Sequence, residues 1–167
     1  FEGVIDLLKM KYFTFEGEMG NKIIEGEIPA EHLDDAKKYR GMMLEAIVEN
    51  DETLMNAYLE GNEPSVDDLK RVLRKATIEN KIVPVFTGSA LKNKGVQLVL
   101  DAVVDYLPSP MDIPPTKGHD PKTGAELFRK ADDTEPFSAL AFKIATDPYV
   151  GQLAFFRVYS GTLESGS

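Results

Sequence analysis

Residues 82–110, IVPVFTGSALKNKGVQLVLDAVVDYLPSP, decide the fold. They open on a short apolar run, 82–87, bounded by turn residues, which is typical of a strand buried on both faces. A loop of small residues begins at Gly88, and after Gly95 a helix is predicted from apolar residues at helical spacing, namely Val96, Leu100, Val103 and Leu107. Strand, small-residue loop and helix form half of an α/β unit, in which ligands bind at the carboxyl ends of the strands. We therefore predict an α/β fold with a candidate ligand loop at 88–95.

A second amphipathic helix is predicted before this unit. Ser65 is placed as its N-cap, with Asp68 three residues later, in a variant of the capping box that favours a helix from Val66. The apolar stripe that we expect to face the core consists of Val66, Leu69, Val72, Leu73 and Ala76.

The N-terminal third predicts short strands followed by a long helix. Segments 3–12 and 13–28 read as short strands that are interrupted by glycine, with Phe13, Phe15, Ile23 and Ile24 as apolar points, which indicates a small hairpin or meander. A helix is predicted from Pro29 to Glu60, because Gly41 is its only glycine. Its apolar stripe consists of Ala36, Met43, Ile47, Leu54 and Tyr58.

Three acidic residues lie opposite that stripe at 100° per residue. Glu45, Glu49 and Glu52 therefore form one predicted acidic strip on the exposed face of the helix. The span 31–68 holds eleven acidic and three basic residues, a charge of −8, whereas the whole chain carries −9. Charged helix faces are common on protein surfaces, so the ordinary interpretation of the strip is a solvated face.

The composition of the 167 residues sets broad limits. With 43% hydrophobic and 28% charged residues the chain has enough material for a core. Its net charge of −9 excludes a broad basic face for nucleic acid, so any such contact must be local. The absence of cysteine excludes disulfides and thiolate metal sites, and we expect a soluble cytoplasmic protein without a membrane span.

The C-terminal third changes character. Residues 111–135 are rich in Pro, Asp, Lys, Gly and Thr, which indicates a linker or exposed loop. Strands are predicted after it, at 137–146 and 152–159, joined by a turn at 147–151. So few strands cannot close a barrel, and the chain opens on Phe1 rather than Met, so we expect a section of a longer protein.

No complete catalytic constellation is present in the sequence. It contains no phosphate-binding Gly-x-x-x-x-Gly-Lys-Ser/Thr, no Gly-x-Gly-x-x-Gly and no His-Glu-x-x-His. The two histidines, His32 and His119, are most simply surface residues.

Three blocks nevertheless resemble one family. GSALKNKGVQLVLDAVVDYLPSP (88–110) resembles the last guanine-recognition loop and closing helix of the translational GTPases, specifically elongation factor G of bacteria or organelles. GVIDLLKMKYFTFEGE (3–18) and DDTEPFSALAFKIATDPYVGQLAFFRVYSG (132–161) agree with it, so the resemblance covers essentially the whole chain.

The resemblance implies a division of the chain. Residues 1–80 correspond to an α+β subdomain inserted into a P-loop GTPase domain, and 81–110 to the last strand, base loop and closing helix of that domain. Residues 111–135 are then a linker, and 136–167 the first strands of a β-barrel second domain. The phosphate loop, the switch regions and the magnesium ligands lie outside this sequence. We expect that the chain alone neither binds nor hydrolyses GTP.

The resemblance also assigns residues. The Ala90 amide corresponds to the donor to guanine O6, Ser89 braces the loop, and Leu91 lies beside the base of GTP or GDP. Glu45, Glu49 and Glu52 match the face that the insert presents to the C-terminal domain of the ribosomal stalk protein L7/L12. The second domain of the family contacts ribosomal RNA, and the family acts on the ribosome in the cytoplasm or an organelle matrix, with no membrane partner.

Two alternatives remain. In the first, the chain is a non-enzymatic adaptor whose function lies in the acidic helix. In the second, it belongs to peptide release factor three, which also carries an insert. The block 137–161 favours elongation factor G over the release factor.

Overall fold

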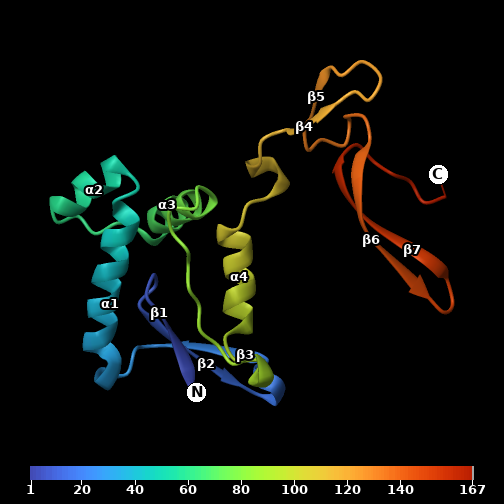
Figure 1. Cartoon of the computed structure of the whole chain (residues 1–167). Coiled ribbons are helices and arrows are strands. Elements are labelled where there is room, and N and C mark those ends of the chain that lie inside the picture. The colour runs from blue at the N-terminus through green and yellow to red at the C-terminus, as the bar shows by residue number, and fades with distance from the viewer. Residues whose placement is uncertain (167) are drawn as a thin grey trace. The chain divides into compact units, whose positions relative to one another are not determined.

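The computed structural model describes residues 1–166. Ser167, the last residue of the expected barrel segment, lies outside the described residues. The chain divides into two compact units, one formed by Phe1–Leu107 and the other beginning at Pro108. Helices are mixed with small antiparallel sheets, so the chain is an α/β protein (Figure 1). None of the helices within residues 1–166 is long and apolar enough to cross a membrane.

The first unit begins with an antiparallel meander, as the glycine-interrupted segments predict. Its strands are β1 (Gly3–Asp6), β2 (Lys11–Glu16) and β3 (Lys22–Gly26), in the order β1-β2-β3. The first turn lies at residues 7–10, earlier than expected, because the Asp6 carboxylate accepts the backbone N–H groups of Leu8 and Lys9. A short 3₁₀ turn, η1 (Glu18–Gly20), joins β2 to β3.

The predicted long helix is wrong at one point, because it is two helices. α1 covers Ala30–Val48 and α2 covers Glu52–Leu59. The break comes from Asp51, which has extended backbone angles and whose carboxylate accepts the Leu54 N–H at 3.0 Å as an N-cap. The apolar stripe still faces inward: Ala36, Ile47 and Leu54 are buried, and Met43 and Tyr58 are half-buried.

α3 (Val66–Ile78) begins where the sequence predicts. The Ser65 hydroxyl accepts the Asp68 N–H at 3.1 Å and donates to the Asp68 carboxylate at 2.6 Å. Its predicted stripe is confirmed, since Leu69, Val72, Leu73 and Ala76 are buried and Val66 is half-buried.

The core lies where α1 and α4 (Val96–Tyr106) meet α3. Figure 1 shows α1 and α4 rising from the same side of the sheet, with α3 near their C-terminal ends. The most deeply buried side chains are those of Ile47, Val48, Leu69 and Val72. Polar contacts also tie α3 to α4: Lys70 Nζ lies 2.6 Å from the Asp105 carboxylate, and the Arg74 guanidinium donates to the Val104 and Asp105 carbonyl groups at 3.2 and 3.0 Å.

The stripe predicted for α4 does not face the core. Leu100, Val103 and Leu107 are 61%, 45% and 51% exposed, whereas Ala102 and Tyr106 are buried. α4 is apolar on more than one side, so its spacing pattern fits two faces and only the position of α3 selects between them. Burial, together with the nearby carboxylates of Asp105 and Asp6, raises the pKa of Tyr106 to about 12.

The strand predicted at 82–87 is also wrong. The segment is extended but pairs with no strand among the described residues, and Val83 and Val85 are 81% and 84% exposed. Ile82 packs against the core, and the Phe86 ring, which is 46% exposed, stacks on Tyr106 with centroids 6.3 Å apart. A buried strand needs neighbouring strands to satisfy its backbone, and the described chain places none beside this one.

The second unit contains two hairpins. Where a linker is expected at 111–135, a 3₁₀ turn, η3 (Pro110–Asp112), precedes paired strands β4 (Thr116–His119) and β5 (Glu126–Arg129). The predicted later pair is present as β6 (Ser138–Asp147) and β7 (Gly151–Ser160). The turn between them forms as predicted, because the Asp147 carboxylate accepts the Tyr149 and Val150 N–H groups.

The core assignment is testable with two leucines of contrasting burial. Leu69 is 0% exposed, and we expect Leu69→Ala to lower the free energy of unfolding by about 2–5 kcal/mol, since it leaves a cavity. Leu59 is 74% exposed, and Leu59→Ala is expected to change the free energy of unfolding by less than about 0.5 kcal/mol. Urea denaturation followed by circular dichroism measures both, and equal effects of the two variants would contradict this core.

Candidate functional site

The loop 88–95 is a closed structure rather than an open connection. The Ser89 N–H donates to the Lys94 carbonyl at 2.8 Å, and the Lys94 N–H donates back to the Ser89 carbonyl at 3.0 Å. The Ser89 carbonyl also accepts the Lys92 N–H at 3.2 Å. Ser89 therefore closes the loop through its backbone N–H and carbonyl groups.

Two glycines allow this closure. A Cβ on Gly88 would stand 2.8 Å from the Lys94 carbonyl oxygen, a distance that a real side chain does not tolerate. Gly95 has φ +84°, and a Cβ there would meet the Thr87 carbonyl oxygen at 3.0 Å. The two arms of the loop can approach each other only because both positions lack a side chain.

The tip of the loop presents backbone donors to solvent. It is a single 3₁₀ turn, η2 (Ala90–Lys92), and Ala90 and the 87%-exposed Leu91 both lie on the surface. Within residues 1–166, the backbone N–H groups of Ala90 and Leu91 donate to no acceptor. N–H groups at the start of a helical turn lack an internal partner, and such groups bind acceptor atoms of ligands. The structure thus places Ala90 and Leu91 together at one exposed tip, and the half-buried Ser89 directly before it.

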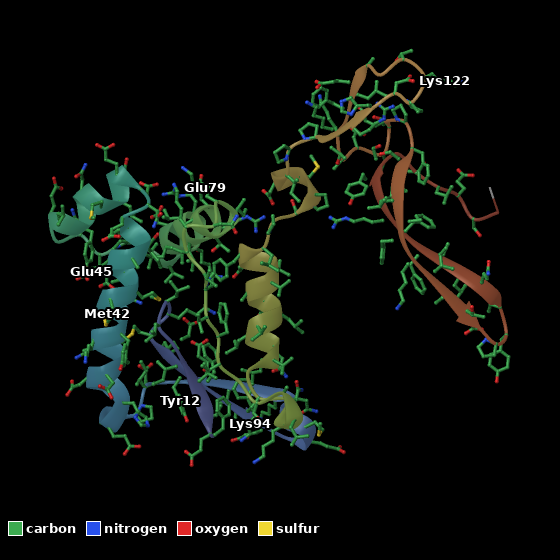
Figure 2. All side chains as sticks on the ribbon, in the orientation of Figure 1. Tyr12, Met42, Glu45, Glu79, Lys94 and Lys122 are labelled. Atoms are coloured by element: carbon green, nitrogen blue, oxygen red, sulfur yellow. The ribbon has the colours of Figure 1, made fainter. Side chains whose placement is uncertain are left out.

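The base of the loop rests on η1. The Asn93 side-chain amide donates to the Met19 carbonyl at 2.9 Å, and the Gln97 side-chain amide donates to the Gly20 carbonyl at 3.3 Å. Figure 2 shows Lys94, which lies in this loop, beside the N-terminal sheet. The sequence analysis missed these contacts, because they join residues more than seventy positions apart. The available signal was Asn93 before Lys94-Gly95, since Asn tolerates the left-handed backbone (φ 49°) found there.

The three acidic residues are all exposed, but they do not share one helix face. Glu45 lies on α1, Glu49 is its C-cap, and Glu52 is the first residue of α2. In Figure 2, Glu45 and Met42 project from α1 on the side away from α3 and α4. Met42 and Tyr39 are 58% and 53% exposed, so apolar side chains accompany the acids on α1. The predicted single strip is wrong because the helix breaks at Asp51.

Asp51 holds in place the junction of α1 and α2, where Glu45, Glu49 and Glu52 form an exposed acidic surface. Its carboxylate caps α2 and also lies 3.1 Å from the Arg71 guanidinium of α3. The Leu54 N–H first, and the Arg71 side chain second, lower the pKa of Asp51 from 3.8. The Arg71 guanidinium also lies 3.6 Å from the Asp68 carboxylate, so one guanidinium joins the N-terminal ends of α2 and α3.

In residues 1–166 no three His, Asp or Glu side chains lie together as metal ligands.

The comparisons with known proteins concern the fold. No protein-family model matches the chain. Among solved structures, the chain is similar to the crystal structure of ttk003000868 from Thermus thermophilus, with a TM-score of 0.73 and 30% sequence identity. The match covers 99% of this chain and 22% of that chain, so this chain spans less than a quarter of the protein it matches. The name of that protein states no activity, and the match supports the α/β fold.

Asp51 can be tested by substitution and by pH. Asp51→Ala removes the N-cap of α2 and the ion pair to Arg71, so we expect a lower urea midpoint at pH 6. A lowered pKa means that this stabilisation is complete above 3.8 and disappears as the pH falls through the folded-state pKa. The difference in midpoint between the two proteins should therefore shrink at pH 3. Asp34→Ala, at an exposed position of α1, is the control, and equal midpoints for Asp51→Ala and the native chain at pH 6 would refute the role.

Proposed function

We propose that the chain is part of a translational GTPase of the elongation factor G family. The observation that carries the proposal is the closed loop 88–95, whose exposed tip presents the Ala90 and Leu91 N–H groups. In this proposal 81–110 is the end of the GTPase domain, 1–80 its inserted subdomain, and 136–167 the start of a β-barrel domain. The segment 111–135, with its β4–β5 hairpin, connects the two.

The proposed chemistry of the loop is recognition of guanine O6. That atom is an acceptor, whereas adenine carries an amino group at the same position, so a fixed donor discriminates between the two bases. A backbone N–H held in a closed loop is such a donor, and the small side chains of Ser89 and Ala90 let a base edge approach it. Leu91, exposed at the tip, offers an apolar contact beside the base.

The remaining nucleotide contacts are proposed to come from a longer protein. The chain spans 22% of the Thermus thermophilus protein that it resembles. The exposed apolar side chains of Val83 and Val85, and the outer face of α4, are surfaces that further elements of a GTPase domain would cover. Phosphate and magnesium contacts supply most of the binding free energy of a nucleotide and all of its hydrolysis chemistry.

The proposed activity of the intact protein is GTP hydrolysis on the ribosome, coupled to movement of tRNA and mRNA. Glu45, Glu49 and Glu52 would attract the C-terminal domain of the ribosomal stalk protein, and the second domain would contact ribosomal RNA. Acidic side chains around exposed Tyr39 and Met42 support a protein partner with a basic and partly apolar surface. The place of action would be the cytoplasm or an organelle matrix.

The base contact is tested by deleting one donor in the intact GTPase. Ala90→Pro removes the N–H at the first position of a helical turn, where proline fits the backbone. We expect the affinity for GTP to fall roughly tenfold, the value of one hydrogen bond to a buried acceptor. The affinity for 2,6-diaminopurine riboside triphosphate, which has no O6, should not fall.

The control variant is Lys92→Ala, which keeps every backbone donor of the loop and should bind GTP normally. Equal losses for the two nucleotides in Ala90→Pro would contradict recognition of O6. For the 167-residue chain alone we expect no GTP binding by calorimetry, and micromolar affinity there would overturn the proposed need for outside phosphate contacts.

The acidic surface is tested by reversing its charge. Glu45→Lys, Glu49→Lys and Glu52→Lys together should slow association with the stalk C-terminal domain and reduce stalk-dependent GTP turnover, with the larger effect at low salt. Reversal of Glu2, Glu16 and Glu25 changes the net charge equally at exposed positions elsewhere and is the matched control. If both triple variants associate at the native rate, the surface is not the stalk site.

A further inference from the structure

The turn η1 has an unusual backbone for a connection between two strands. Gly17, Met19 and Gly20 all have positive φ, at 79°, 54° and 60°. A left-handed backbone is costly for a residue with a side chain, so Met19 needs compensation from its surroundings. This compensation is visible in what the turn contacts.

η1 fits closely against the second half of the loop 88–95. Gly20 is buried, and a Cβ there would stand 2.9 Å from the Asn93 carbonyl oxygen and 3.0 Å from that of Lys92. Two hydrogen bonds form in the same contact. The Met19 carbonyl accepts from the Asn93 side-chain amide at 2.9 Å, and the Gly20 carbonyl accepts from the Gln97 side-chain amide at 3.3 Å. The turn therefore holds the loop through both steric fit and hydrogen bonds.

The two residues that reach η1 occupy special places in the loop. Asn93 follows η2 directly and has the left-handed backbone that ends this turn, so its side-chain bond fixes the end of the loop tip. Gln97 lies in the first turn of α4, the helix that leaves the loop. Its Oε1 is buried without a partner, so the side chain is held in place at the cost of an unsatisfied acceptor.

We propose that η1 is a brace that positions the loop 88–95 for base binding, with Gly20 and Asn93 as its positioning residues. The proposal rests on the proposed function, because it assigns the purpose of the brace to the guanine contact of Ala90. Without the brace the tip would lose its two side-chain bonds to η1 and would be held mainly by backbone bonds within the loop. The Ala90 N–H would then sample more positions, and the base would lose affinity when it fixes one of them.

Two variants remove the brace in different ways. Asn93→Gly keeps a residue that tolerates the left-handed backbone but deletes the bond to Met19. Gly20→Ala puts a Cβ against the Asn93 and Lys92 carbonyl groups. Gly61→Ala is the matched control for backbone strain, since Gly61 has φ +87° and nothing lies within 4 Å of its added Cβ.

The first measurement is amide hydrogen exchange in the 167-residue chain. The Ser89 and Lys94 amides, which close the loop, should exchange at least threefold faster in Asn93→Gly and Gly20→Ala than in the native chain, and at the native rate in Gly61→Ala. Native exchange rates in both brace variants would overturn the brace itself, whatever the function of the loop.

The second measurement uses the intact GTPase. Both brace variants should weaken GTP binding three- to tenfold, with unchanged kcat at saturating GTP and with unchanged affinity for 2,6-diaminopurine riboside triphosphate. A merely structural role would lower binding of the two nucleotides equally, and this result would refute positioning. Faster amide exchange with native GTP affinity would show that η1 holds the loop without affecting base binding. That result would overturn the positioning role and leave the guanine contact to the Ala90→Pro test.

Discussion

Val48 and Leu69 are fully buried where α1 meets α3, and this apolar contact is the constraint on which the N-terminal unit depends. Apolar burial is non-directional, so it brings the helices together but does not determine which other segments lie at their ends. Arg40 of α1 supplies direction: its guanidinium donates to the carbonyl groups of Leu7 and Leu8 in the β1–β2 turn and to the Glu63 carboxylate. The sheet is thereby attached to the helical core, and η1 at its far end is brought to the loop 88–95.

The same packing leaves apolar surface uncovered. α3 covers one side of α4, while Leu100 and Val104 on the other side are 61% and 77% exposed, and Val83 and Val85 are exposed nearby in sequence. Exposed apolar patches of proteins mark interaction surfaces. The extended segment 82–87 acquires no ladder within the described residues.

The candidate site combines two sources of rigidity. Glycines at 88 and 95 let the loop close on itself, and the contact with η1 fixes its second half from outside. The tip keeps its backbone donors exposed while the rest of the loop is held. An acceptor atom that binds there meets donors whose positions are already fixed, which reduces the ordering cost of binding.

Local patterns in the sequence were sufficient where one element determines its own structure. Ser65 with Asp68 placed the start of α3, Asp147 placed the β6–β7 turn, and the period of Leu69, Val72 and Leu73 gave the buried face of α3. The small-residue loop at 88–90 was found in the same way. The break at Asp51 was also local, but one helix was predicted because Gly41 is the only glycine between Pro29 and Glu60.

Tertiary structure decided the rest, because the deciding partners are distant in the chain. α4 is apolar on two faces, and only the position of α3 determined that Tyr106 is buried and Leu100 exposed. The run 82–87 has the composition of a buried strand, yet strands require neighbours, and the fold places none there within residues 1–166. The contact of Asn93 with Met19 spans 74 positions. The sequence by itself determined where a loop of small residues would lie, and only three-dimensional packing determined what holds it.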